Sequence, residues 1–373
     1  MGRRSIYIIT AAAACLLLCC APAAEKEPGS SGKLPAGENI SSPGSLSQEA
    51  VSAPVAVIDN YIMPRGQVDP VIEVDIYEKG LVYPGTTILT DNHDAENPRI
   101  IEVNLLGEVL WEYRVPYALH RFVNPGFEAQ RLPDDNILFI LPRYGVFEID
   151  RSGKTVWSYL DGKISHDVDR LENGNTLVVW GNDQKGDAQV KEISQAGEIV
   201  WSWSVKKVFD YPPYSTIYAD GWTHTNAASR LPNGNTLVSL RNFNIVAEVN
   251  PDGELVRTYG EGVFSDQHDP ELLANGNMLV ANHRPQPPNN AVEIDPDSQQ
   301  IVWSFGGSQW APQLVRDADR LPNGNTLITG TNRIIEVTTD GKIVWQLRLK
   351  AEIAREQSSG RGFFKAQRAD HSD

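Results

Sequence analysis

The stretch RLPNGNTL at residues 230–237 decides the fold, because the chain repeats it. An identical copy stands at 320–327, and variants are RLPDDNIL (131–138), RLENGNTL (170–177), ELLANGNML (271–279) and a degenerate YPGTTIL (83–89). A second phrase, typified by GKIVW at 341–345, follows each copy. Its tryptophans are Trp111, Trp157, Trp201, Trp303 and Trp345, and Arg257 takes the tryptophan's place in one copy. Six copies of both phrases predict a repeat architecture.

One clear copy shows which strands a repeat contains. Residues 167–171, 175–181, 189–194 and 198–203 are short apolar segments separated by turn-forming residues. The Asn-Gly pair joins the first two segments as a hairpin turn. Four short antiparallel strands in each of six repeats predict an all-β, six-bladed β-propeller. The tryptophans on the outer strands are expected to pack between neighbouring blades.

The N-terminus predicts export. A basic start and an apolar run precede small residues, as in a signal peptide, and LLCC at residues 17–20 resembles a lipobox with Cys20 as the lipidated residue. We expect a signal segment at 1–20, a flexible tether at 21–53, the propeller at 54–368 and a frayed tail at 369–373. The protein would then be periplasmic, surface-attached or secreted, with simple cleavage as the alternative to lipidation.

Charge and cysteines exclude several classes of protein. The net charge of −15 argues against nucleic acid as a partner, because such binding needs basic patches. All three cysteines, at 15, 19 and 20, lie in the predicted leader, so we expect no disulfide or thiol chemistry in the propeller. The membrane is expected as a partner only through an N-terminal lipid anchor.

Two segments interrupt the repeat. A long insertion precedes His224, and its part from Phe209 to Tyr218 is rich in aromatic residues, which is typical of a functional loop. Near the C-terminus, GFFKAQR at 362–368 is expected to pair with a blade and close the ring.

Candidate catalytic residues occupy one slot of the repeat. This slot is the position seven residues before the first Asn of Asn-Gly-Asn, or before the first of the two aspartates in RLPDDNIL. It holds Phe127, His166, Asn226, His268 and Arg316 in successive copies. His224 lies two residues before Asn226, on the same face of a strand, and Arg241 ends the next strand. His166, His224, His268 and Arg241 would converge at one end of the channel, where they suit an anion. A three-histidine zinc site is weaker because no His-x-His spacing occurs. The adjacent Asp167, Asp269 and Asp317 are typical of repeat structure.

These residues also carry a resemblance. GWTHTN (221–226), SLR (239–241), DQHD (266–269) and ISHD (164–167) resemble motifs of the bacterial aryl-sulfate sulfotransferases, and the likeness covers about residues 75–350. VANH at 280–283 departs from the Phe-Asp-Asn-Gly often found there in the family.

The resemblance implies an activity and assigns roles. His268 would be the nucleophile that becomes transiently sulfated, while His166, His224 and Arg241 would bind the sulfuryl oxygens and help the phenolate leave. The donor would be a phenolic sulfate ester, the acceptor a phenol, and no cofactor or metal would be needed. We expect Asn226, Trp222, Tyr214 and Tyr218 to contact the substrate.

Two other functions stay open. A non-catalytic propeller of the cell envelope would bind a ligand or protein through the channel mouth and the loop from Phe209 to Tyr218. A quinone-dependent dehydrogenase is less favoured, because eight tryptophan-containing blades and a metal site are expected there.

Overall fold

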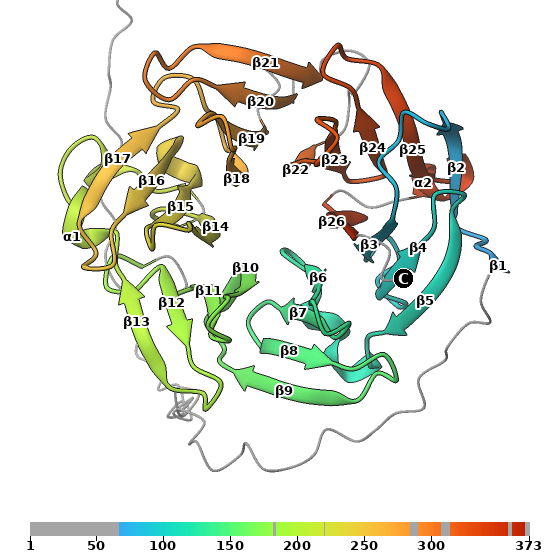
Figure 1. The fold of residues 1–373 in the computed structure, drawn as a ribbon. Coiled ribbons are helices and arrows are strands. Elements are labelled where there is room, and N and C mark those ends of the chain that lie inside the picture. Colours follow the sequence, from blue (N-terminus) through green and yellow to red (C-terminus); the bar gives the residue numbers. More distant parts are fainter. Residues whose placement is uncertain are drawn as a thin grey trace, which may run out of the picture. The chain divides into compact units, whose positions relative to one another are not determined.

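A six-bladed β-propeller forms the folded part of the chain (Figure 1). The computed structural model describes residues 67–181, 184–219, 221–283, 290–306, 314–356 and 360–369. The chain divides into two parts, residues 1–52 and 53–373, and the propeller lies in the second. The predicted leader, Cys20, the tether and the tail beyond residue 369 lie outside the described residues. No helix among the described residues is long and apolar enough to cross a membrane.

Four blades follow the predicted plan of four antiparallel strands in chain order, from the axis outward. Blade 2 contains β6 Ala129–Arg131, β7 Ile137–Leu141, β8 Gly145–Ile149 and β9 Thr155–Leu160. Blade 3 contains β10 Ile164–Arg170, β11 Thr176–Trp180, β12 Val190–Ile193 and β13 Ile199–Trp203. Blade 4 contains β14 Thr225–Arg230, β15 Thr236–Leu240, β16 Ile245–Val249 and β17 Leu255–Tyr259. Blade 5 contains β18 His268–Leu272, β19 Met278–Asn282, β20 Asn290–Ile294 and β21 Ile301–Gly306.

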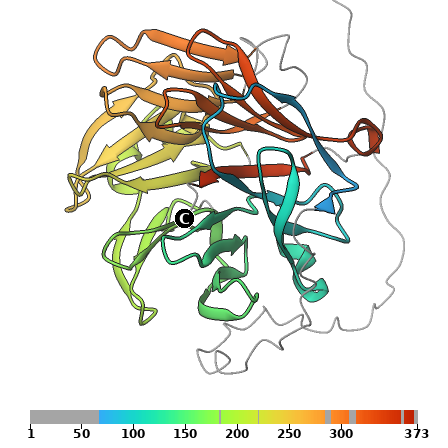
Figure 2. The same cartoon turned by 45° about the vertical axis from the view of Figure 1, so that its right-hand side comes forward.

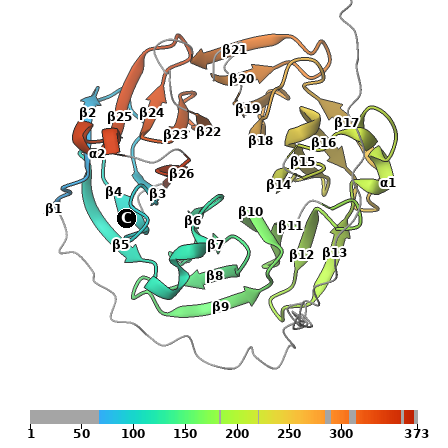
Figure 3. The same cartoon turned by 180° about the vertical axis from the view of Figure 1, so that it is seen from behind.

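Both ends of the propeller chain close the ring, as Figures 2 and 3 show from other sides. Blade 6 contains β22 Val315–Arg320, β23 Thr326–Gly330, β24 Arg333–Val337 and β25 Ile343–Leu349, with β2 Ile72–Tyr77 added outside β25. Blade 1 contains β3 Thr86–Asp91, β4 Arg99–Val103 and β5 Glu108–Arg114, with β1 Gln67–Val68 outside and β26 Phe363–Ala369 as the innermost strand. The C-terminal segment therefore pairs with β3, which confirms the predicted closure.

The recurring Asn-Gly-Asn phrase builds the turn after the innermost strand. In blade 4 the side chain of Asn233 accepts a hydrogen bond from the backbone N–H of Asn235, 2.9 Å. Gly234 has φ +87°, which favours glycine. The Asn235 amide donates to Glu248 on β16, 2.6 Å. Each residue of the phrase thus has a turn-specific role, which explains why the phrase recurs.

The outer-strand tryptophans join each blade to the next. Each indole N–H donates to a backbone carbonyl of the following blade: Trp111 to Arg151, Trp157 to Gln195, Trp201 to Pro251, Trp303 to Thr339 and Trp345 to Leu105, at 2.8–3.0 Å. An arginine of the following blade stacks on the indole and pairs with a glutamate of the first blade. Arg230, for example, lies 5.1 Å from the Trp201 ring and 2.8 Å from Glu192. The tryptophans therefore have the predicted structural role.

The joint between blades 4 and 5 replaces this arrangement with another. Arg257 stands where the tryptophan would be and donates to the Pro296 carbonyl, 3.0 Å. Leu272 occupies the position of the stacking arginine and packs in the core beside Tyr259. The Tyr259 hydroxyl donates to Glu248, 2.5 Å, so the glutamate keeps a partner. Arg257 in place of the tryptophan and Leu272 in place of the arginine thus fall on the same joint. Together they replace the usual tryptophan–arginine pair there.

Short helices fill the connections. They are η2 Tyr117–Phe122, α1 Lys206–Phe209, η3 Tyr214–Thr216, η4 Arg241–Phe243 and α2 Ala351–Glu356. The long insertion between β13 and β14 contains α1 and η3, and it packs on blade 4. Its Phe209 and Trp222 are each 1% exposed and share a core cluster with Phe243. This part of the insertion is therefore fixed to the propeller.

Candidate functional site

The slot residues come together because each inner strand is irregular at that place. The strand pairing shifts register between Ile164 and Val168, Thr225 and Ala227, His268 and Glu271, and Val315 and Asp317. A β-bulge re-aims the side chains next to it. His224 lies just before such a bulge and Asp269 lies within one, with φ +45° and +48°. The repeat therefore presents His166, His224, His268 and Arg316 from successive blades.

His268 lies at the centre of this group. Its side chain is buried, and its ring stacks on His283 with centroids 3.9 Å apart. Nδ1 lies 3.0 Å from the Asp266 carbonyl oxygen. A carbonyl only accepts, so Nδ1 carries the hydrogen and Nε2 of the neutral ring keeps a lone pair. Burial, with His283 and Arg241 nearby, holds the pKa of His268 well below its ordinary value. His268 is thus a neutral imidazole whose Nε2 keeps its lone pair.

His166 and His224 form a second pair beside it. Their ring centroids are 5.0 Å apart, and His166 Nδ1 contacts the Ser165 hydroxyl. Burial, reinforced by His224 and Arg241, lowers the pKa of His166 to about 3. His166 is therefore also uncharged near neutral pH, and it can offer one N–H donor without a full charge.

Arg241 supplies a guanidinium. It begins η4 directly after β15, where it is partly buried, and Nη2 lies 4.0 Å from Asp266 Oδ1. Asp266 is the residue whose carbonyl holds His268. Arg241 is close enough to lower the pKa values of His166 and His268. The structure thus brings together all four residues that the sequence predicted as catalytic.

Asn226 fixes the backbone next to His268. Its side-chain amide donates to the Gln267 carbonyl across the joint between blades 4 and 5, 2.9 Å. Its Oδ1 is buried without a hydrogen-bond partner in the structure. Asn226 therefore positions the strand that carries His268, and its predicted contact with substrate stays a prediction.

The sequence reasoning missed His283 as a site residue. It follows β19, where the sequence departs from the family's pattern at VANH, and that departure was the available signal. Its Nε2 is buried without a hydrogen-bond partner. Burial, with Arg316 and Arg241 nearby, lowers its pKa to about 3.

Arg316 was also missed, although it occupies the repeat slot. It is 6% exposed, donates to the Gly360 carbonyl at 3.0 Å, and lies 4.9 Å from the Phe364 ring. Burial lowers its pKa to about 10, so it stays charged at neutral pH. Its Nε has no hydrogen-bond partner in the structure. The site therefore holds two guanidinium groups, which suits a tetrahedral oxyanion.

The three aromatic residues predicted to contact the substrate lie elsewhere. Trp222 is buried in the blade 4 core, and its indole donates to the Tyr214 carbonyl, 2.8 Å. Tyr214 packs against the same core, and Tyr218 is 69% exposed. None of the three lines the cavity described next, and their contact with substrate stays a prediction.

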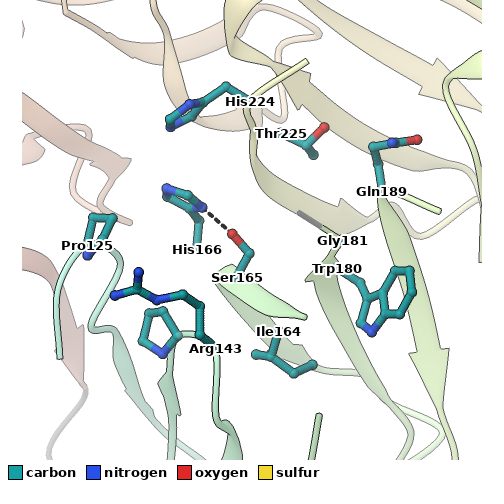
Figure 4. A pocket seen from close by; sticks show the side chains of 11 residues that line it. Pro125, Arg143, Ile164, Ser165, His166, Trp180, Gly181, Gln189, His224 and Thr225 are labelled. Atoms are coloured by element: carbon teal, nitrogen blue, oxygen red, sulfur yellow. Dashed lines mark hydrogen bonds between the residues drawn. The ribbon is translucent and has the colours of Figure 1, made fainter. Parts of the chain in front are cut away.

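A cavity of about 320 Å³ opens beside His166 and His224 (Figure 4). Its walls include Pro125, Pro142, Ile164 and Trp180, and Arg143 stands at one side. Flat and apolar surfaces of this kind accept an aromatic ring. The cavity is thus suited to place a planar group next to the two histidines.

The histidines do not form a metal site in the described part of the chain. There, the side chains whose ligand atoms lie close enough for one ion are Asp269, Asp317 and Asp319, and no three histidines qualify. The weaker prediction of a three-histidine zinc site therefore finds no support in the described residues.

Several solved structures are similar to this chain. A protein of unknown function from Bacteroides caccae is 19% identical, with 73% of this chain and 96% of that chain covered and a TM-score of 0.53. A streptogramin B lyase is 13% identical, with 76% and 89% covered and a TM-score of 0.46. A virginiamycin B lyase from Staphylococcus aureus is 13% identical, with 74% and 88% covered and a TM-score of 0.46. At 19% identity, the likeness to the Bacteroides caccae protein shows the fold alone.

The sequence itself identifies the family. No curated protein matches the chain. The profile of the family described as Arylsulfotransferase (ASST) matches residues 77–275, which is more than half of the chain. The match includes His166, His224, Arg241 and His268, the residues that the fold brings together. The chain belongs to the arylsulfotransferase (ASST) family.

Proposed function

We propose that this protein moves a sulfuryl group from a phenolic sulfate ester to a phenol through a sulfo-histidine at His268. The observation that carries the proposal is the state of His268: it is buried and neutral, and its Nδ1–H donates to the Asp266 carbonyl. A nucleophilic imidazole needs that tautomer, because the attacking Nε2 must keep its lone pair. The family match and the surrounding cationic side chains support the same reaction.

The first step forms a nitrogen–sulfur bond. Nε2 of His268 attacks sulfur, the bond from sulfur to the phenolic oxygen breaks, and the phenolate leaves with the electron pair. The ring then carries a positive charge, which the Asp266 carbonyl stabilises through Nδ1–H. Arg241 and Arg316 offset the charge on the sulfuryl oxygens. The leaving phenolate, whose acid has a pKa of about 10, takes up a proton from solvent water in the pocket beside His166 and His224.

The second step reverses the first with another phenol. The acceptor phenol gives its proton to the solvent, which regains the proton it supplied in the first step, and the phenol oxygen attacks sulfur. The nitrogen–sulfur bond breaks with its electron pair on Nε2, so His268 returns to its neutral form. Donor and acceptor rings would occupy the same cavity in turn, between Pro125, Pro142 and Trp180. This order of events gives ping-pong kinetics, and no cofactor takes part.

Kinetics of two matched variants test the proposal. His268→Asn should lower turnover of a chromogenic aryl sulfate on the order of 10³-fold or more, since the nucleophile is lost. His120→Asn is the control, because His120 lies on η2 and contacts the Val115 carbonyl. Initial rates of the unaltered protein should give parallel double-reciprocal lines. Retained turnover in His268→Asn would contradict the assignment.

The predicted non-catalytic propeller is the second candidate. It is favoured by exposed aromatic side chains on the insertion, where Tyr211 is 50% and Tyr218 69% exposed. A well-folded protein that turns over no aryl sulfate, but loses ligand or protein binding on removal of this loop, would support it.

We further propose that the protein is exported and attached to a membrane by a lipid on Cys20. The support is the leader-like segment at residues 1–20. Labelling with a fatty acid in cells should mark the unaltered protein and spare Cys20→Ser. Equal labelling of both would contradict lipidation at that residue.

A further inference from the structure

A group of carboxylates lies one residue beyond the histidines and arginines of the site. The residues directly after the slot are Glu128, Asp167, Asp269 and Asp317. Asp169 and Asp319 follow two residues later on their strands, and a spacing of two returns a side chain to the same face. Glu271 stands in the same relation to Asp269, so seven acidic side chains lie on or next to the innermost strands beneath the catalytic layer.

Lys365 on β26 is paired with part of this group. Its Nζ lies 2.7 Å from Asp167, 2.8 Å from Asp269 and 3.2 Å from Glu128. These carboxylates, despite burial of the ammonium, raise the pKa of Lys365 well above its ordinary value. Lys365 therefore balances one unit of a larger negative charge.

On the other side of the group, Asp317 and Asp319 form no ion pair with a cation among the described residues, although the charge of Lys365 acts on both from a greater distance. Ligand oxygens of Asp269, Asp317 and Asp319 all lie within 4.8 Å of one another. Asp317 is 2% exposed, and its Oδ2 accepts from the backbone N–H of Ala366, 3.2 Å. Its Oδ1 is buried without any hydrogen-bond partner. An unpartnered buried carboxylate oxygen beside two further carboxylates is costly unless a cation or a shared proton neutralises the group.

We propose that Asp269, Asp317 and Asp319 bind a calcium ion on the axis of the propeller. The ligand set consists only of oxygen atoms, which calcium prefers. Calcium–oxygen distances are about 2.3–2.6 Å, so two ligands of one ion stand at most about 5 Å apart. The three aspartates meet this limit without movement of the backbone, and water would complete the coordination.

Asp269 links the two halves of the carboxylate group. Its Oδ1 contacts Lys365 at 2.8 Å, and it also contributes a ligand oxygen within 4.8 Å of those of Asp317 and Asp319. A calcium ion there would join blades 5 and 6 directly beneath His268 and Arg316.

Calorimetry on the full chain tests the proposal without any assay of sulfate transfer. The protein is treated with EDTA, dialysed and titrated with calcium chloride. We expect one saturable site and a melting temperature that rises by a few degrees at saturation. Asp319→Asn should weaken binding at least about tenfold, and the exposed Asp252→Asn should leave it unchanged. Asp317→Asn serves as a second variant, should Asp319→Asn fail to fold.

Two results would overturn the proposal. The first is the absence of saturable heat and of any change in melting temperature at millimolar calcium, which would mean that shared protons alone relieve the repulsion. The second is calcium binding that both Asp319→Asn and Asp317→Asn leave unchanged. Either result would leave the sulfuryl-transfer proposal intact, because His268 is not a ligand of the ion.

Discussion

The protonation of His268 decides what the site can do. Burial and neighbouring cationic groups keep the ring neutral, and the Asp266 carbonyl selects the tautomer. A nucleophile that needs no deprotonation at neutral pH is ready to attack when the donor binds. The same surroundings lower the pKa of His166 and His283, so three neutral imidazoles and two arginines share one site.

The rate should therefore stay high in mild acid. With an ordinary histidine pKa of 6.5, the neutral fraction would fall about 25-fold between pH 7 and pH 5. Because the pKa of His268 is held well below that value, we expect kcat/KM for an aryl sulfate to change less than about threefold over the same range. A pH–rate profile checks this, and an acidic limb centred near 6.5 would contradict it.

Stability should respond to pH through the same side chains. His166 and His283 have folded pKa values of about 3, below the unfolded value. Between pH 6.5 and 3 the unfolded chain binds more protons, so the free energy of unfolding falls as the pH is lowered. His283→Gln should flatten this dependence, measured as melting temperature from pH 7 to 4.5. His120→Gln is the control, and identical slopes for His283→Gln and the unaltered protein would refute the expectation.

The predictive power of the sequence also differs from residue to residue. The repeat phrase places His166 and His268 at one slot, because residues at the same distance before the recurring turn occupy equivalent positions on the innermost strands. His283 follows the end of β19 and lies outside that slot. No local sequence pattern indicates the direction of a side chain that follows the end of a strand. Trp222 and Tyr214 lie in an insertion, where packing on Phe243 decides their orientation.

At the scale of the strands, the tryptophans that join neighbouring blades make equivalent hydrogen bonds but differ in how deeply they are buried. Trp345 is completely buried at the joint that closes the ring, between blades 6 and 1. Trp201 makes an equivalent hydrogen bond to Pro251 but is only partly buried. The sequence predicts both tryptophans as structural, yet it cannot rank them, because burial depends on β2 and β26 arriving from the two ends of the chain.

Replacing these tryptophans should reveal the difference. Trp345→Leu should lower the free energy of unfolding by about 3 kcal/mol, through loss of packing and of the indole hydrogen bond. Trp201→Leu should cost about 1 kcal/mol, for the hydrogen bond and the stacking of Arg230. Urea denaturation of both variants gives the two values. Equal losses would show that the joints do not differ as their burial implies.

At the scale of the whole propeller, strands from both ends of its chain complete the first and last blades and so close the ring. The C-terminal strand β26 supplies the innermost strand of blade 1, and Lys365 on it reaches Asp167 and Asp269 of blades 3 and 5. The predicted pairing of residues 362–368 was correct, because an apolar strand-like segment after the last blade has an incomplete blade to join. The addition of β2 to blade 6 was not predicted, since pairing between distant segments leaves no local pattern.

A single glycine tests this closure. A Cβ at Gly85 would lie 2.2 Å from the Ala369 carbonyl oxygen, whereas a Cβ at Gly80 would meet nothing within 4 Å. Both residues have positive φ, so Gly80→Ala controls for backbone strain. Gly85→Ala should destabilise the protein by at least about 2 kcal/mol more and speed hydrogen exchange in β26. Equal effects of the two substitutions would mean that β26 does not close the ring tightly.

The most direct measurement is peptide mass spectrometry of the protein after mixing with a chromogenic aryl sulfate and no acceptor. We expect a sulfuryl mass gain on the peptide that contains His268, and we expect added phenol to discharge it. His268→Asn should gain nothing, and His283→Gln, which keeps the nucleophile, should still be labelled. A folded protein that releases phenol without labelling His268, or that releases none with any of several donors, would contradict the sulfo-histidine mechanism.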